Sequence, residues 1–263
     1  MLKKLLKYEL KSIYKFLIIF YSLSLFFAIL TRIFFNIENS FIMNIIAGIC
    51  SGVTISMILN ILINNLIRLW VRFKNNLYGD ESYLTHTLPI EKKTLYISKI
   101  LSAIVSLFTS ILVIGLTLFI AYYSKENIEI LKNILLPLVD IYNSSIIKIL
   151  LAFLFIFFLE FANALQAGYT GIILGHKMNN NKTAFSVLFG FISYMVIQTF
   201  GLFSLFIVSL FNKDLMNLFI TNEMINIDMV KVIIYLSTAI YTISLIVIYF
   251  VNIKLFKKGV NVD

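Results

Sequence analysis

The side chains best suited to chemistry lie in one polar stretch between Arg68 and Lys99, RLWVRFKNNLYGDESYLTHTLPIEKKTLYISK. Its adjacent carboxylates, Asp80 and Glu81, could serve as general acid and base, and His86 could carry a proton near neutral pH. Adjacent residues on a helix diverge by about 100°, and no histidine, serine or metal set converges on this pair. We therefore favour a solvated turn or a salt-bridging contact over catalysis.

Thiol and metal chemistry have few candidate residues in this chain. Cys50 is the only cysteine, which excludes an intrachain disulfide and a cysteine-based zinc cluster. His86 and His176 are the only histidines, and they fall in different predicted loops. We favour solvated or hydrogen-bonded loop residues over a shared metal site.

Glu160 is a second chemical candidate, because it lies near the middle of a long apolar run. An ionised carboxylate in a membrane is costly, and a neutral one still needs a partner. Gln198 lies at a similar depth in the next run, so we expect a hydrogen bond between the two. The acid suits cargo or proton handling, and a structural role fits equally well. Further polar candidates inside the runs are Asn60, Asn64 and Asn163.

The elements that position these residues are membrane helices. The chain has 263 residues, of which 60% are hydrophobic and 13% charged, whereas soluble domains are about one-quarter charged. Six apolar runs are long enough to cross a hydrocarbon core of about 30 Å. They are 16–35, 41–66, 100–123, 149–174, 184–211 and 232–253. These runs lack the polar/apolar alternation of barrel strands, so they predict an all-α polytopic fold with six transmembrane helices.

The distribution of basic residues predicts the orientation. Most of the 22 Lys and Arg residues fall on one side if the N-terminus is cytoplasmic, so both termini and the polar stretch 68–99 are expected in the cytoplasm. The net charge of +9 then reflects topology and anionic lipid headgroups. Nucleic-acid binding is the less favoured interpretation.

The sequence predicts a separate amphipathic helix at residues 1–15, on the inner face of the membrane, followed by a six-span transmembrane domain at residues 16–263. Leucines and Ile13 recur at helical spacing, while lysines point elsewhere. This helix would act as a topology anchor or as a lever that links a cytoplasmic partner to the first span. No cleavable signal peptide is expected, because the first apolar run is too long for one.

Small residues recur along two of the runs. The first stripe is Gly48, Gly52 and Ser56, continued by Asn60 and Asn64, and the second is Ala164, Gly168, Gly171 and Gly175. Stripes of this kind let neighbouring helices approach closely. We favour helix packing over the lining of a substrate path for both.

Within the polar stretch, Tyr78-Gly79-Asp80-Glu81 predicts a turn, and 83–88 an extended or short helical piece. Pro89 predicts the start of a helix that runs into the third span. A short helix framed by turns is typical of a structured docking element.

The segment YGDESYLTHTLPIEKKTLYISKIL resembles the loop between the second and third spans of type 2 ATP-binding cassette (ABC-2) exporter permeases of low-GC Gram-positive bacteria. The basic LLKYELKSIYK, the connection LGHKMNNNK and the ending FKKGVNVD agree with this resemblance. Ser82 departs from it, because many relatives have Gly after the acidic pair.

The resemblance implies a permease subunit in the bacterial cell membrane that exports a peptide, antibiotic or other amphipathic cargo. It would pair with a second permease copy or a related chain, and with separate ATPase subunits that hold ATP and magnesium. This chain would hydrolyse nothing itself, and it contains no G-x-x-x-x-G-K-S/T phosphate loop. The implied ATPase-coupling loop comprises Tyr78, Gly79, Asp80, Glu81, Tyr83, Leu84, Thr85, Thr87, Leu88 and Pro89.

Three other functions remain open at this point. An ion-gradient-driven secondary transporter would use Glu160 and Gln198 near mid-membrane, although no pair of matching broken spans is evident. An intramembrane hydrolase needs a nucleophile or metal set at membrane depth, and both histidines lie at the cytoplasmic edge. An immunity or sensor protein would need no transport activity.

Overall fold

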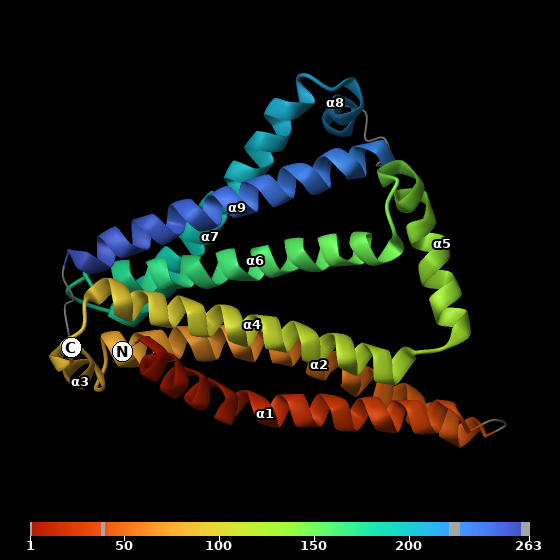
Figure 1. Ribbon diagram of the computed structural model, residues 1–263, viewed down its shortest axis with the longest axis horizontal. Helices are drawn as coiled ribbons and strands as arrows, with labels where there is room; N and C mark the ends of the chain where they lie inside the picture. The colour runs from red at the N-terminus through yellow and green to blue at the C-terminus, as the bar shows by residue number, and fades with distance from the viewer. Residues whose placement is uncertain (1, 38–39, 221–226, 259–263) are drawn as a thin grey trace. The chain divides into compact units, whose positions relative to one another are not determined.

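The computed structural model describes residues 2–37, 40–220 and 227–258. These residues form helices joined by short connections, and no strand occurs among them, so the all-α prediction is confirmed (Figure 1). The chain divides into two compact units, Met1–Glu129 and Ile130–Asp263. The predicted division into residues 1–15 and one six-span domain stays a prediction.

Each unit holds three of the long helices. The first contains α1 (Leu2–Phe35), α2 (Phe41–Leu77), α3 (Ser82–Thr87) and α4 (Lys92–Tyr122). The second contains α6 (Ile146–Gly175), α7 (Lys182–Ser209), α8 (Lys213–Ile220) and α9 (Ile227–Lys257). The division between the units falls within α5 (Lys125–Tyr142).

Six helices, α1, α2, α4, α6, α7 and α9, are long and apolar enough to cross a membrane. This finding supports a multi-pass membrane protein. The helices extend beyond the apolar runs: α1 continues without a break from Leu2 through the first run, and α2 continues past Leu66 to Leu77. The apolar residues set the length of helix that lies in lipid. Lys and Arg are also good helix formers, so a helix can continue past the apolar run into charged sequence.

In the first unit, α1 packs against α2 and α4, and α2 also packs against α4. Hydroxyl and amide groups join these helices at membrane depth. The Tyr21 and Ser110 hydroxyls lie 2.7 Å apart, and Asn65 donates to the Ser110 hydroxyl at 2.7 Å. Thr31 and Thr54 are 3.1 Å apart. Interhelical hydrogen bonds in a membrane are each worth about 0.6 kcal/mol, so a series of them fixes the helix register.

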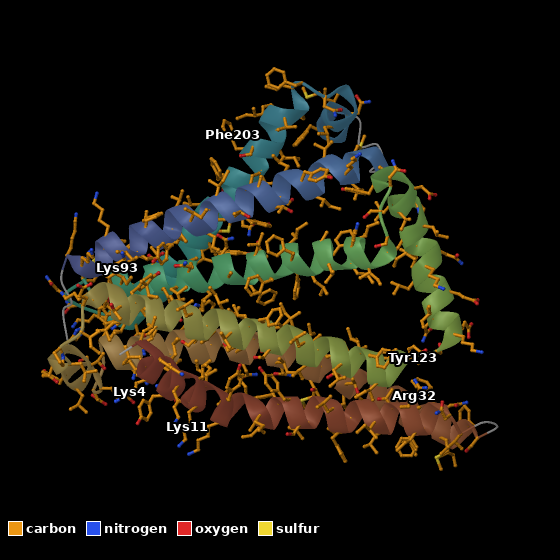
Figure 2. All side chains as sticks on the ribbon, viewed as in Figure 1. Lys4, Lys11, Arg32, Lys93, Tyr123 and Phe203 are labelled. Carbon is orange, nitrogen blue, oxygen red and sulfur yellow. The ribbon has the colours of Figure 1, made fainter. Side chains whose placement is uncertain are left out.

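The C-terminal end of α1 carries Arg32. Its guanidinium donates to the carbonyl of Tyr123, just after α4, and lies 5.9 Å from the centre of the Tyr123 ring (Figure 2). Lys4 and Lys11 lie at the other end of α1 and point away from the helix bundle (Figure 2). The charged groups of α1 are therefore kept near its two ends.

In the second unit, α6 packs against α7 and α9. A Cβ added to Gly171 would lie 2.3 Å from the Ser186 carbonyl oxygen, and one added to Gly175 would lie 2.4 Å from the Ser186 nitrogen. Only glycine fits at these crossings, which confirms the packing interpretation for this stripe. Added Cβ atoms at Gly48 and Gly52 meet no described atom within 4 Å. The two glycines of the α2 stripe therefore contact no neighbouring helix in the described part of the chain.

Candidate functional site

The connection between α2 and α4 contains the turn and the short helix that the sequence predicts. The amides of Tyr78 and Gly79 both donate to the Lys74 carbonyl, at 2.8 and 3.1 Å, and end α2. Pro89 disfavours helical dihedrals at Leu88, which is extended with ψ 135°, so α3 ends at Thr87. The next helix, α4, begins at Lys92 and not at Pro89 as predicted.

The short helix α3 presents apolar side chains on its outer surface. Tyr83 is 66% exposed, Leu84 75% and Leu88 43%. Large apolar side chains exposed together on a short polar-flanked helix are typical of a binding surface. The other predicted loop residues at the surface are Asp80, Glu81, Thr87 and Pro89, while Gly79 and Thr85 are half-buried.

The inner side of the same connection is buried. Tyr78 and Ser82 have almost no exposed surface, and the Tyr78 ring packs 6.4 Å from that of Phe73 on α2. Burial raises the pKa of the Tyr78 hydroxyl above its ordinary value of 10.0, so this group stays neutral. The connection is therefore anchored on one side and open on the other.

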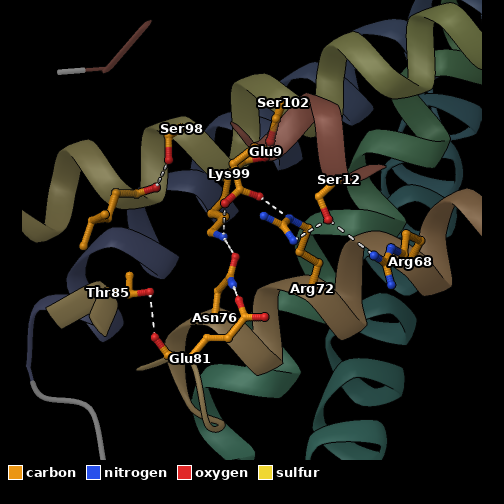
Figure 3. Close-up of polar contacts among 11 residues, drawn as sticks. Glu9, Ser12, Arg68, Arg72, Asn76, Glu81, Thr85, Ser98, Lys99 and Ser102 are labelled. Atoms are coloured by element: carbon orange, nitrogen blue, oxygen red, sulfur yellow. Dashed lines mark hydrogen bonds and ion pairs between the residues drawn. The ribbon is translucent and has the colours of Figure 1, made fainter. Parts of the chain in front are cut away.

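A buried ion cluster ties the base of this connection to α1. The carboxylate of Glu9 on α1 accepts from Arg72 Nε on α2 and from Lys99 Nζ on α4, each at 2.6 Å (Figure 3). The side chain of Lys99 is 5% exposed and that of Glu9 11%. Arg72 also donates to the Ser12 hydroxyl at 2.6 Å. One carboxylate thus joins all three long helices of the first unit.

The same cluster reaches α3 through an amide. Lys99 donates to the carboxamide oxygen of Asn76, and the Asn76 amide donates to the carboxylate of Glu81, which precedes α3 (Figure 3). Thr85 in turn donates to the Glu81 carbonyl at 3.0 Å. An unbroken chain of polar contacts therefore runs from α1 to α3. The sequence favoured a solvated turn or a salt-bridging contact for Glu81, and the contact seen is a hydrogen bond from the neutral Asn76 amide.

Glu9 was not singled out from the sequence, although a pattern for it exists. It is the only acidic residue before Glu38, and it lies four residues from both Leu5 and Ile13, which places it on the apolar face of the helix. A lone acid on an apolar face among lysines indicates a buried partner. Which lysine or arginine it meets depends on α2 and α4.

Glu160 forms the hydrogen bond that the sequence predicts. Gln198 Nε2 on α7 donates to Glu160 Oε1 at 2.8 Å, and the Tyr194 hydroxyl donates to the same oxygen. The Tyr241 hydroxyl on α9 lies 3.5 Å from Gln198 Oε1. Glu160 Oε2 is buried and has no hydrogen-bond partner among the described residues. Three helices thus contribute to one polar cluster, which we call the Glu160 cluster (Glu160, Tyr194, Gln198, Tyr241).

The asparagine candidates occupy different environments. Asn163 Nδ2 donates to the Tyr241 carbonyl at 2.9 Å and so joins α6 to α9. Asn60 and Asn64 donate to carbonyls within α2 itself, those of Ser56 and Asn60. The amide that links α2 to α4 belongs instead to Asn65, on the other side of the helix. Sequence reasoning also missed a buried set of Gln166, Thr170 and Asn252 that joins α6 to α9.

Both histidines are hydrogen-bonded, as favoured from the sequence. His86 Nε2 lies 3.1 Å from the Leu77 carbonyl oxygen, and His176 Nδ1 lies 2.9 Å from that of Ile172. Among the described residues, no group of three His, Cys, Asp or Glu side chains is placed to hold a metal ion.

Comparison with protein-family models, with curated proteins and with solved structures found no match to this chain.

Proposed function

We propose that the chain is the membrane-spanning permease subunit of an ATP-binding cassette exporter in the bacterial cell membrane. Both termini and α3 would face the cytoplasm, and ATP would be hydrolysed on a separate ATPase subunit. A second permease copy or related chain would complete the path for an amphipathic cargo. The resemblance of residues 78–101 to ABC-2 permeases suggests this function, and the structure of the same connection supports it.

The observation that carries the proposal is the two-sided character of α3. A coupling element must offer a surface to the ATPase and must pass its displacement to the membrane helices. Tyr83 and Leu84 provide exposed apolar surface, and the contacts from Glu81 through Asn76 to Lys99 and Glu9 provide the connection. A push on α3 would therefore reach α1, α2 and α4 together.

Tyr83 and Leu84 are better residues than Glu81 for testing whether α3 binds the ATPase. Glu81 supports the base of α3, so its substitution would disturb the fold as well as any docking. Tyr83 and Leu84 lack this drawback because their side chains are mostly exposed. Tyr8 is 68% exposed on α1, which makes it a matched control for Tyr83.

The proposal is tested by purification of the tagged chain from its native membrane in mild detergent, with mass spectrometry of co-purifying proteins and an ATPase assay. We expect a stoichiometric ATP-binding protein that is lost from the double variant Tyr83→Ala/Leu84→Ala and retained by Tyr8→Ala. Equal recovery of the ATP-binding protein with both variants would show that Tyr83 and Leu84 of α3 do not form the docking site. Recovery of the chain alone across several mild detergents would refute the proposal that it is the permease subunit of such an exporter.

The Glu160 cluster favours one second candidate, an ion-gradient-driven transporter. A carboxyl at membrane depth with tyrosine and glutamine partners is the kind of group that such transporters use. The discriminating experiment is uptake or efflux by the purified chain in vesicles with an imposed proton or sodium gradient and no nucleotide. Gradient-driven transport that Glu160→Gln abolishes would support this candidate over the first.

A further inference from the structure

The Glu160 cluster lacks one hydrogen bond and one positive charge. Oε1 of the carboxyl accepts from both Tyr194 and Gln198, whereas Oε2 is buried without a partner among the described residues. Neither ion pair in the described part of the chain includes Glu160. The apolar runs 149–174, 184–211 and 232–253 contain no Lys or Arg. A positive charge to balance this carboxylate therefore has to come from outside these three spans.

A proton alone would not satisfy this carboxyl. It would remove the charge, but it would also add an O–H donor on Oε2, which needs an acceptor of its own. A positively charged hydrogen-bond donor removes both deficits at once, because it neutralises the carboxylate and bonds to Oε2. An ammonium group is the simplest ligand with these properties.

A cavity lies beside the cluster, between α7 and α9. It has a volume of about 140 Å³, and Gln198 and Tyr241 form part of its wall. A single water needs only about 10–15 Å³ by the same kind of measure, so the space holds a group of several heavy atoms. The remaining wall is largely aliphatic, formed by Gly201, Leu202, Leu205, Leu236, Ser237 and Ile240.

The polar part of the wall suits hydrogen-bond donors. Among the described residues, Gln198 Oε1 receives only the long 3.5 Å contact from the Tyr241 hydroxyl, so it has acceptor capacity to spare. Tyr241 adds an aromatic ring to the wall, and such rings attract cations. Gln198 belongs both to the cavity wall and to the hydrogen bond with Glu160, so a small shift of its carboxamide would open a path from the cavity to the carboxylate.

We propose that the Glu160 cluster and the adjoining cavity form a membrane-buried binding site for a primary alkylammonium group. The ammonium would bond to Glu160, Gln198 and Tyr241, and the alkyl chain would lie against the leucines of α7 and α9. The inference is independent of the proposed ATPase partner, because every group in the site belongs to residues 130–263.

The test uses the full chain in lipid nanodiscs at neutral pH, with native mass spectrometry as the readout and octylamine as the probe. Octan-1-ol has the same chain without the charge, and octyltrimethylammonium has the charge without N–H donors. We expect saturable binding of octylamine only. Glu160→Gln should weaken that binding at least about tenfold, as expected for loss of a charge-assisted hydrogen bond, and Glu129→Gln, the same change on exposed α5, should not.

Three results would overturn the site. They are equal binding of octan-1-ol, unchanged octylamine binding by Glu160→Gln, and no saturable binding of octylamine at all. If Glu160→Gln fails to fold, Gln198→Leu and Tyr241→Phe replace it. Each removes one group that we place on the ammonium, so unchanged binding by both variants would also refute the site.

Discussion

Neutralising Glu9 should destabilise the first unit strongly, because one carboxylate compensates two cations. In Glu9→Gln, Lys99 would lose its carboxylate partner and keep only neutral acceptors, such as the Asn76 carboxamide oxygen, while its side chain is 5% exposed. Arg72 is 17% exposed and keeps Ser12, so water and a hydroxyl still solvate it. Removing one partner of a buried ion pair costs about 3–5 kcal/mol. Since only Lys99 is stranded, we expect about 3 kcal/mol.

A second substitution should recover part of this loss. Lys99→Met removes the stranded ammonium, so Glu9→Gln/Lys99→Met should be more stable than Glu9→Gln alone. Groups in one contact network show coupling energies of about 0.5–3 kcal/mol, and we expect about 2 kcal/mol here. Lys99→Met alone should cost less than Glu9→Gln, because Glu9 keeps Arg72 at 2.6 Å.

The assay is reversible unfolding of the purified chain by SDS in mixed micelles, followed by circular dichroism. Glu129→Gln, which changes an exposed glutamate in the same way, serves as the control. Hydrogen exchange at the amides of α3 gives a second readout, because loss of the cluster should loosen Asn76 and Glu81. A cost below about 1 kcal/mol for Glu9→Gln, or strict additivity in the double variant, would show that the cluster is solvated and does not brace α3.

Three further measurements test other parts of the structure. Gly171→Ala should lower the free energy of unfolding in SDS by about 1–3 kcal/mol, because its Cβ would meet the α7 backbone. Gly48→Ala has open space around the new Cβ and should be neutral or stabilising by up to about 1 kcal/mol. Equal effects of the two substitutions would refute the α6–α7 crossing. In a double-mutant cycle, Glu160→Gln and Gln198→Leu should couple by about 0.6–1.7 kcal/mol, and independent effects would show that their hydrogen bond contributes nothing. Burial raises the pKa of the Tyr78 hydroxyl in the folded state, so the unfolded chain loses this proton first and the free energy of unfolding falls as pH rises above about 10. Tyr78→Phe should reduce this fall of the free energy of unfolding with pH. An unchanged pH dependence would contradict the burial of Tyr78.

Local patterns predicted the elements of this chain well. Long apolar runs specify helices because a membrane leaves backbone groups no partner outside the helix, and the six predicted runs correspond to six long helices. The turn at Tyr78 and the end of α3 before Pro89 follow from dihedral preferences of single residues. The boundaries were less accurate, because charged residues extended α2 beyond its apolar run.

Pairs between helices were predictable only where depth alone selected the partner. Glu160 and Gln198 are the case that succeeded, because each is a rare polar group near the middle of its span. Asn64 and Asn65 show the limit: adjacent residues point about 100° apart, and the neighbouring helix decides which of them is buried.

The sequence by itself determined that this is an all-helical membrane chain, since hydrophobic length and backbone satisfaction are local properties. It also located the polar connection between the second and third apolar runs, and it placed Glu160 near the middle of the fourth run. Only the tertiary structure decided that Glu9 compensates Lys99 and Arg72. It also decided that Glu160 Oε2 has no hydrogen-bond partner among the described residues, and that Gln198 and Tyr241 of the Glu160 cluster line a cavity. Those facts depend on the rotation of each helix about its axis, and that rotation is set by the packing of all the helices in a unit together.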